Sequence, residues 1–564
     1  MTKRTILSKL WQLVLKAEAL FERFQIELQG RYSVERLYQM KTYTERVSWG
    51  RLLTVFIVSM VPCLVATISV ECIPLRPISE GLAGSKTFYI RSWIVVHISG
   101  ILAFQHYRQL IPRLPSSLRQ IWIMALVLAT GVIASQYLCA RWIGYPVPFL
   151  SILVGPAYMT MLFLNIGFAW GKFLSQNKAV LKELVQLQGL ISAMFTLCFV
   201  YPVYVYFFVR IPSSLQPLFA VLLPIIKLAA KNMVSPYCKY IEDSKPEAVI
   251  FNVEIFHAYF VSICMQNSTS FRTTALLMLM DFVHAGLSLR DISQLAGEIR
   301  GMRRKLKDKQ QSQNPNTSQP LGDLPAHVLF LLQSDQRVIE TGSIRVQSHH
   351  PLSGPTALFL VKPSNSIAPM NTILPTEVKP IQQNGPMTDA SRLHTNFDLL
   401  RIHHHLPESE QRLLLESLDT NARAEYAAKV LQLMHMVEFL VLIEFTEVII
   451  PFVYSTYLYA TFFLPNHLYH DQLRDVDEAE LRRTLSHVVI YGMLELLSLL
   501  IFQFLIYRKI GISPAHQLGF VLEKQWTLVQ LKLCSWFLFI IQFSMEHFGI
   551  DYTFKFVWLK HTGS

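Results

Sequence analysis

The sequence predicts an all-α, polytopic integral membrane protein, a helix bundle with ten or eleven transmembrane helices and one long disordered cytosolic loop. Apolar runs recur along most of the 564 residues, and about 20 apolar residues in a helix suffice to cross the bilayer core. Only 16% of the residues are charged, against about 25% in a typical soluble domain. Basic residues gather next to the apolar runs, as the positive-inside rule describes.

Residues 1–51 are expected to form a cytosolic amphipathic segment. Ten of them are lysine or arginine, which places this end of the chain in the cytosol. Over the first 30 residues, apolar side chains recur every three or four positions with basic ones between them. That spacing predicts a helix that lies on the membrane surface or against the cytosolic ends of the spans.

The first eight candidate spans lie within residues 52–290. The sixth is the weakest, because Pro224 and Lys227 interrupt a short apolar run, and it either crosses the membrane or re-enters it. The candidates in chain order are Leu52–Val70, Trp93–Ile111, Ile121–Ala140, Phe149–Trp170, Leu190–Val209, Leu215–Ala230, Ala248–Gln266 and Thr273–Leu289.

Residues 291–429 are expected to form a cytosolic loop that begins with a basic stretch. From about Gln310 to Asn421 the loop is polar and rich in proline, with only short apolar islands such as Val328–Leu332. This composition predicts disorder and offers a place where cytosolic protein partners could bind.

Three further spans are expected within residues 430–547, followed by a tail over residues 548–564. Their candidates are Val430–Leu464, Leu485–Tyr507 and Leu528–Met545. The acidic loop around Asp471–Glu480 then falls outside the cell or organelle, and Arg508, Lys509 and Lys524 fall inside.

Ionisable residues occur inside several of these spans, where they are costly and are functional candidates by default. Val430–Leu464 carries three glutamates. Four pairs are spaced three residues apart, so both members of each share one helical face. The candidates are Glu254 with His257, Asp281 with His284, His435 with Glu438, and Glu444 with Glu447, together with Glu495 in the next span. At about 100° per residue, the last two pairs face opposite sides of one helix, which suits a helix at the bundle centre.

Three interpretations of these polar residues stay open. They can hydrogen-bond between helices and fix which helices meet. They can form a pathway for protons or other cations. They can also build a carboxylate–histidine metal centre, since bundle di-metal sites use Glu-x-x-His pairs, and Glu254 with His257 has that spacing.

Other chemistry finds little support in the sequence. There is no GxSxG, HExxH or Walker phosphate-binding motif, so neither an enzymatic activity nor a cofactor is indicated. The seven cysteines are scattered and never in CxxC spacing, which argues against a zinc site or a disulfide framework. The net charge of +12 is explained by loops that face anionic lipid, so no nucleic-acid partner is expected.

Several phrases resemble a large family of multipass membrane proteins from oomycetes that has no assigned activity. They are CMQNSTS at Cys264–Ser270, EFTEVIIPFVY at Glu444–Tyr454, LPN at Leu464–Asn466, HQLGFVLE at His516–Glu523 and HFGIDYTFKFVWL at His547–Leu559. The resemblance covers most of the membrane part and has no counterpart in the Gln310–Asn421 loop. It implies a eukaryotic integral membrane protein, and it carries over no functional residues. The lipid bilayer is the partner that the apolar spans themselves predict.

The sequence therefore favours a transporter or channel-like protein that uses the acids and histidines within its spans. A membrane receptor or scaffold that acts through its cytosolic loop is the first alternative, and a membrane-embedded metalloenzyme is the second.

Overall fold

The structure is a computed structural model, and within the residues that it describes every extended element is a helix. Those residues are 25–212, 214–238, 241–267, 271–308, 323–335, 337–340, 344–345, 419–470, 473–541, 545–550 and 556. The helices are α2 (Val34–Arg46), α3 (Trp49–Val58), α4 (Val61–Glu71), α5 (Gly81–Gly84), α6 (Lys86–Leu110), α7 (Leu118–Ile143), α8 (Leu150–Leu153), α9 (Gly155–Gln176), α10 (Lys178–Arg210), α11 (Gln216–Ala220), α12 (Leu222–Val234), α13 (Lys245–Asn267), α14 (Phe271–Asp308), α15 (Leu324–Ser334), α16 (Arg337–Glu340), α19 (Thr420–Phe462), α20 (Glu478–Ile510), α21 (Pro514–Lys524) and α22 (Trp526–Ile540).

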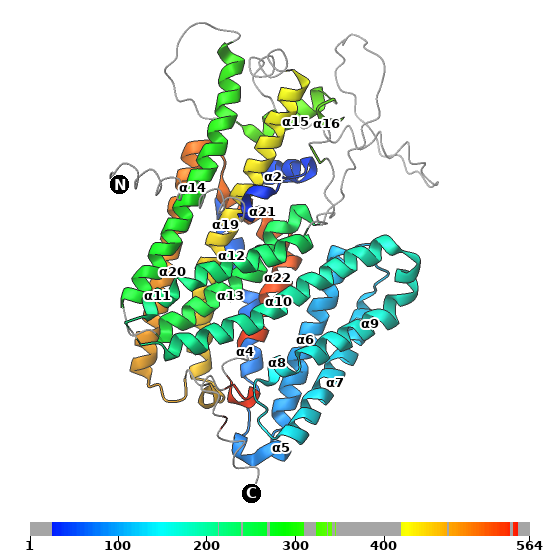
Figure 1. The fold of residues 1–564 in the computed structure, drawn as a ribbon, viewed down its shortest axis with the longest axis vertical. Coiled ribbons are helices and arrows are strands. Elements are labelled where there is room, and N and C mark those ends of the chain that lie inside the picture. The colour runs from blue at the N-terminus through cyan, green and yellow to red at the C-terminus, as the bar shows by residue number, and fades with distance from the viewer. Residues whose placement is uncertain are drawn as a thin grey trace, which may run out of the picture.

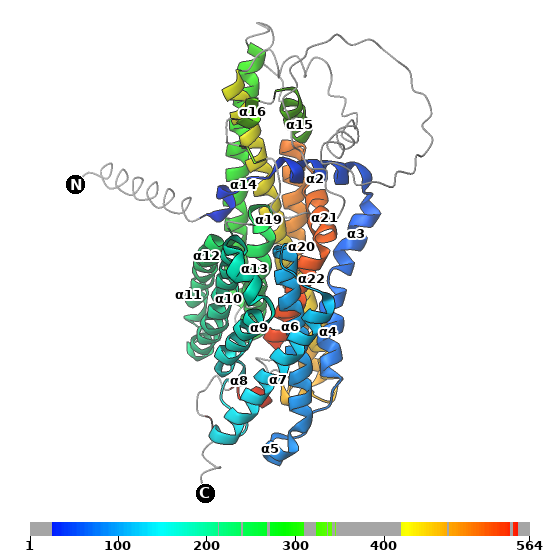
Figure 2. The same ribbon diagram turned by 90° about the vertical axis from the view of Figure 1, so that its right-hand side faces the viewer.

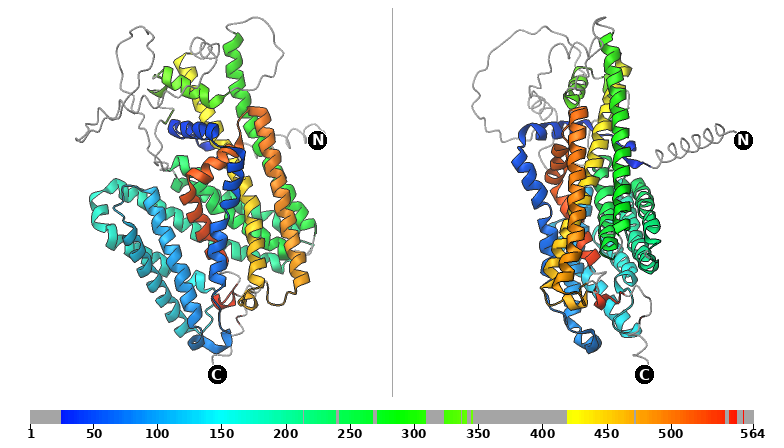
Figure 3. Two further views of the ribbon diagram at one scale, coloured as in Figure 1. Left: turned by 180° about the vertical axis from the view of Figure 1, so that it is seen from behind. Right: turned by 90° about the vertical axis from the view of Figure 1, so that its left-hand side faces the viewer.

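The helices form an elongated bundle made of two groups. The long helices α14, α19 and α20 lie side by side in one group, and α6, α7 and α9 form the other (Figure 1). Helices α10, α12 and α13 run obliquely between the groups, and α13 packs against α19 and α22. Helices α2, α15 and α16 lie at one end of the bundle, and α5 lies at the other (Figure 2). The view from behind shows the same division (Figure 3).

Within the described residues, eight helical segments are long and apolar enough to cross a membrane, which agrees with a multipass membrane protein. They are Trp49–Glu71, Lys86–Leu110, Leu118–Ile143, Leu150–Gln176, Lys178–Phe208, Gln216–Cys238, Glu242–Cys264 and Glu478–Ile510. The sixth expected span is among them. Pro224 falls in the first turn of α12, where its missing N–H has no helical partner to lose.

The remaining three expected spans correspond to α14, α19 and α22, which are not among these eight. Helix α22 has only 15 residues. Helix α19 has 43 residues, but three glutamates fall within its apolar run, and nearly all of its residues between Val430 and Tyr454 are buried against protein. A helix that is surrounded by other helices can carry polar groups that lipid would exclude.

Parts of the expected loop over residues 291–429, for which disorder was predicted from about Gln310 to Asn421, are helical where the structure describes them. Helix α14 continues from the membrane region through the basic stretch to Asp308. Helix α15 contains the apolar island Val328–Leu332 and packs against α2 and α19, with Asp323 as its N-cap. Residues 346–418 lie outside the described residues, as do residues 1–24 with most of the expected amphipathic helix.

Candidate functional site

Helices α13 and α19 form the centre of the bundle. Within the span Glu242–Cys264, every residue from Glu247 to Cys264 is buried inside the protein, whereas the apolar stretches of the other seven candidate spans are half buried or less. Polar side chains in the buried parts of α13 and α19 therefore have no access to water and must pair with protein groups, bound ions or protons.

Two lysines of α12 supply part of that pairing. Lys227 and Lys231 are four residues apart, so both ammonium groups lie on one face of α12. Both reach the carboxylate of Glu254 on α13, each with Nζ 2.9 Å from an oxygen. Lys227 also donates to Glu447 of α19 across 2.6 Å, and Lys231 donates to Glu27 across 3.0 Å. We call these five residues the lysine–carboxylate chain.

The chain continues into a group of three glutamates. Glu444, Glu447 and Glu495 each offer one carboxylate oxygen, and these oxygens lie within 4.8 Å of one another. All three side chains are buried. Glu444 accepts a hydrogen bond of 3.0 Å from the Ser498 hydroxyl of α20. We call these three residues the glutamate triad; Glu447 belongs to both groups.

The charges of the two groups do not balance. Five carboxylates, from Glu27, Glu254, Glu444, Glu447 and Glu495, face the two ammonium groups of the lysines. Carboxylates this close cannot all ionise in a dry interior, so some of them bear a proton or share a bound cation.

Two histidines and an aspartate complete the surroundings. Asp281 of α14 interacts electrostatically with Lys227, Glu447 and Glu495. His257 interacts with Lys227 and Glu254, and His284 with Lys227 and Lys231. The structure thus brings Glu254/His257, Asp281/His284 and Glu444/Glu447 to one region, together with Glu495.

The fourth pair lies elsewhere. Glu438 accepts a hydrogen bond from Tyr32, and its other oxygen is 2.7 Å from Nη2 of Arg36. The same Arg36 nitrogen is 2.7 Å from Glu247 of α13. His435 packs directly against Gly30: a Cβ atom added to Gly30 would lie 1.8 Å from Nε2 of the His435 ring. Glu438 and Glu447 therefore meet partners from different neighbours of α19.

Arg36 reaches this position because of how α2 begins. The hydroxyl of Ser33 caps the helix by accepting from the Arg36 N–H, and the Ser33 N–H donates to Asp243 across 2.9 Å. Burial lowers the pKa of Arg36, but the Glu438 and Glu247 carboxylates outweigh it and hold that pKa well above its usual value. We call Arg36, Tyr32, Glu247 and Glu438 the arginine cluster.

A third buried cluster lies near the end of the bundle that carries α5. Glu71 pairs with Arg91 at 2.6 Å, accepts from the Tyr457 hydroxyl at 2.9 Å and lies 3.2 Å from Nε2 of His470. Asn466 donates to the backbone carbonyl of Glu71 at 2.8 Å. This cluster joins the end of α4 to the start of α6 and to the loop between α19 and α20.

Sequence reasoning missed the cations of all three clusters. Lys227 weakened the prediction of the sixth span, Leu215–Ala230, and Lys231 was assigned to the loop that follows that span. The available signal was the balance of charge: acids inside apolar runs call for basic partners inside other apolar runs, and α12 carries both lysines.

Among the described residues, the group able to hold a metal ion is the glutamate triad. Its ligands are all carboxylates, which suit hard cations such as Mg²⁺, Ca²⁺ or Mn²⁺. The alternative of a Glu-x-x-His metal centre stays a prediction: both oxygens of Glu254 face lysines, and the ring of His435 packs against Tyr32.

No protein family, curated protein or solved structure matches the chain. The resemblance to the oomycete family stays a prediction.

Proposed function

We propose that the protein is a cation-coupled transporter of the membrane in which it resides, and that a proton or metal cation binds at the glutamate triad in competition with Lys227. The observation that carries this proposal is the position of Lys227. Its ammonium bridges Glu254 of α13 and Glu447 of α19, and Glu447 is also a member of the triad.

Competition follows from this shared carboxylate. A cation at the triad draws on the same Glu447 carboxylate that Lys227 uses, so each bound charge weakens the other. When the cation binds, Lys227 keeps Glu254 as its partner and loses part of its bond to α19. Cation occupancy thereby changes the contact between α12 and α19, which is the kind of differential contact that alternating access requires.

The excess of carboxylates supports transport over a purely structural joint. Groups that only hold helices together are most stable when each charge is paired, because an unpaired buried charge costs several kcal/mol. Here three carboxylates remain once the two lysines are matched. A site that must take up and release cations needs this surplus.

Flux through vesicles tests the proposal. Purified protein in proteoliposomes is exposed to gradients of H⁺, Na⁺, Ca²⁺ and Mn²⁺ with a panel of solutes, and a pH-sensitive dye inside reports proton movement. We expect Glu444→Gln and Glu447→Gln each to reduce cation-dependent flux about tenfold or more. Glu478→Gln serves as a control, since Glu478 forms an exposed pair with Arg482 at 2.5 Å.

The proposal fails if both triad variants match the wild type in every flux. It also fails if the wild type moves none of these cations and none of them raises its melting temperature, because a site that binds the cation must stabilise the folded protein.

A further inference from the structure

A pocket lies beside the group of helices formed by α6, α7 and α9, and no residue of the glutamate triad lines it. It lies between α6, α7, α9, α10, α13 and α22, and the centre of a water-sized sphere can move through about 170 Å³ of it. That space holds several water-sized groups in a row, as an alkyl chain requires. Most of its wall is apolar and includes Val95, Val132, Leu190, Met194, Phe195 and Phe539.

One lysine stands out in this apolar wall. Lys532 of α22 lines the pocket and is only 7% exposed. Within the described part of the chain its ammonium makes one hydrogen bond, to the Glu247 carbonyl oxygen at 3.2 Å, and no ion pair. An ammonium group carries three donors, so two remain for a ligand.

The register of the helices places Lys532 toward one end of the pocket. Leu538 of α22 packs against Val95 of α6 and Val70 of α4. Gln530, which precedes Leu538 in α22, donates to the carbonyl oxygen of Ser59, which precedes Val70 of α4. Helices α22 and α4 therefore run in the same direction, and α22 runs antiparallel to α6. Lys532 precedes Leu538 by six residues, or about 9 Å of helix. It therefore lies toward the end of the pocket that His106 lines.

Two polar residues of the pocket wall are engaged with each other. The indole N–H of Trp536 donates to the side-chain oxygen of Asn252 across 2.8 Å, and both residues line the pocket. The pocket thus offers one positive group near one end of a long hydrocarbon wall. A buried ammonium with a single hydrogen bond is costly, and an anionic partner would relieve that cost.

We propose that this pocket binds a single-chain anionic amphiphile, with its head group on the Lys532 ammonium and its alkyl chain along α6 and α10. A fatty-acid carboxylate and a lysophospholipid phosphate share this chemistry. The proposal does not depend on the proposed transport of cations, because the pocket and the glutamate triad have no residue in common.

Bromine quenching of tryptophan fluorescence tests the proposal, because Trp536 lines the pocket. The full-length protein in phosphatidylcholine nanodiscs is titrated with dibromostearate, with dibromostearoyl lysophosphatidate and with dibromostearyl alcohol, which has the same chain without the charge. We expect at least one anionic probe to bind about tenfold or more tightly than the alcohol, as a charged hydrogen bond provides. The tighter anion identifies the head group.

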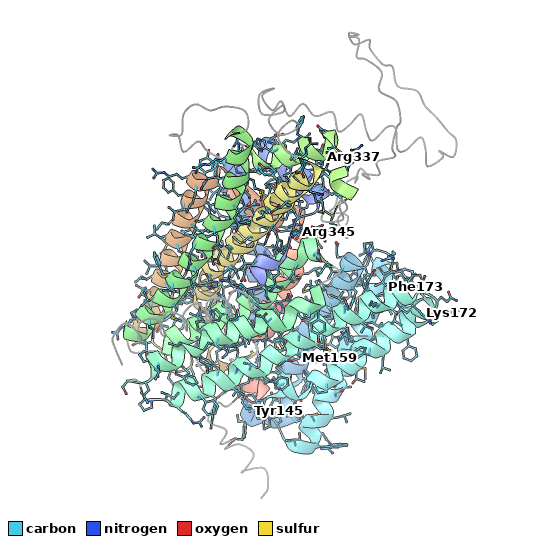
Figure 4. The ribbon with its side chains drawn as sticks, turned by 45° about the horizontal axis from the view of Figure 1, so that its top comes forward. Tyr145, Met159, Lys172, Phe173, Arg337 and Arg345 are labelled. Carbon is cyan, nitrogen blue, oxygen red and sulfur yellow. The ribbon has the colours of Figure 1, made fainter. Side chains whose placement is uncertain are left out.

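Substitutions assign that preference to Lys532. Lys532→Gln should remove the preference for the anion while the alcohol still binds, and Lys532→Arg should keep it. Trp536→Phe should abolish most of the quenching. Lys172→Gln is the matched control, because Lys172 is exposed near the end of α9 and lies at the outer edge of the helices (Figure 4).

Two results would overturn the proposal. One is equal binding of the alcohol and both anions by the wild type. The other is an anion preference that survives in Lys532→Gln. Because each measurement is a ratio between two probes on the same protein, a partly unfolded variant changes both affinities and leaves the ratio interpretable.

Discussion

Replacement of Lys227 by methionine is expected to destabilise the protein strongly. Methionine is about as long as lysine and fills the same space, so the substitution removes the charge with little change in packing. Glu447 then loses the ammonium at 2.6 Å, while Glu254 loses one of its two lysines. Removing one partner of a buried ion pair costs about 3–5 kcal/mol, because the other charge stays buried without compensation.

A double-mutant cycle measures whether this loss comes from the pair itself. The free energy of unfolding in detergent is determined from tryptophan fluorescence for Lys227→Met, Glu447→Met and the double variant. We expect the double variant to be more stable than the sum of the single losses predicts, by about 1–3 kcal/mol, since both charges leave together.

The reasoning would be refuted if Lys227→Met stayed within about 0.5 kcal/mol of the wild type, the range of an ordinary surface substitution. Strict additivity of the two single losses would refute it equally. Lys172→Met, on the exposed part of α9, provides the baseline for a lysine without buried partners.

Three more predictions concern Arg36, His547 and the topology of the bundle. Arg36→Ala should lower the free energy of unfolding by about 3–5 kcal/mol, because two buried carboxylates lose their cation. Arg36→Lys should lower it less, and equal losses for the two variants would contradict this reasoning. Burial lowers the pKa of His547 to about 4, so the unfolded chain takes up a proton at a higher pH than the folded protein does. The free energy of unfolding should therefore fall by up to about 3 kcal/mol as the pH drops from about 6.5 to about 4. His547→Asn should make the free energy of unfolding less dependent on pH in this range, as acid denaturation measures. An impermeant thiol reagent should label a cysteine at Asp475 and one at Arg304 from opposite sides of the membrane. Asp475 belongs to the connection between α19 and α20 and Arg304 to the C-terminal part of α14, and these two segments lie at opposite ends of the bundle (Figure 1). Labelling of both from one side would contradict the topology.

The membrane helices could be predicted from the sequence because length and apolarity alone decide whether a helix can span a bilayer. The central position of α19 in the bundle could also be predicted from the sequence. Glutamates on two of its faces require polar partners on two sides, and the structure gives Glu438 an arginine and Glu447 a lysine. This argument needed only the helical repeat.

The partners themselves could not be predicted from the sequence. Lys227 and Glu447 are 220 residues apart in the chain, and no local pattern connects them. A lysine in an apolar run lowers the score of that run as a span unless its acidic partner is known. The sequence of α15 likewise gave only a short apolar stretch within a predicted loop. Its apolar residues are buried only because α2 and α19 lie beside it in the folded protein.

Helix α13 contributes to the lysine–carboxylate chain, to the arginine cluster and to the wall of the pocket. Glu254 faces the lysines of α12, whereas Asn252 holds Trp536 at the wall of the pocket. Glu247 joins Arg36 through its side chain and Lys532 through its carbonyl. Residues 252 and 254 are about 200° apart around the helix, so a rigid shift of α13 moves both sites at once.

This shared helix predicts that the two proposed ligands affect each other. If dibromostearate changes the affinity for a cation by some factor, the cation must change the affinity for dibromostearate by the same factor, because coupling between sites is reciprocal. Titration of each ligand at zero and saturating concentrations of the other measures the factor, and we expect it to be about fivefold or more. A factor of one, with both ligands bound, would mean that α13 stays fixed and that the pocket and the triad work independently.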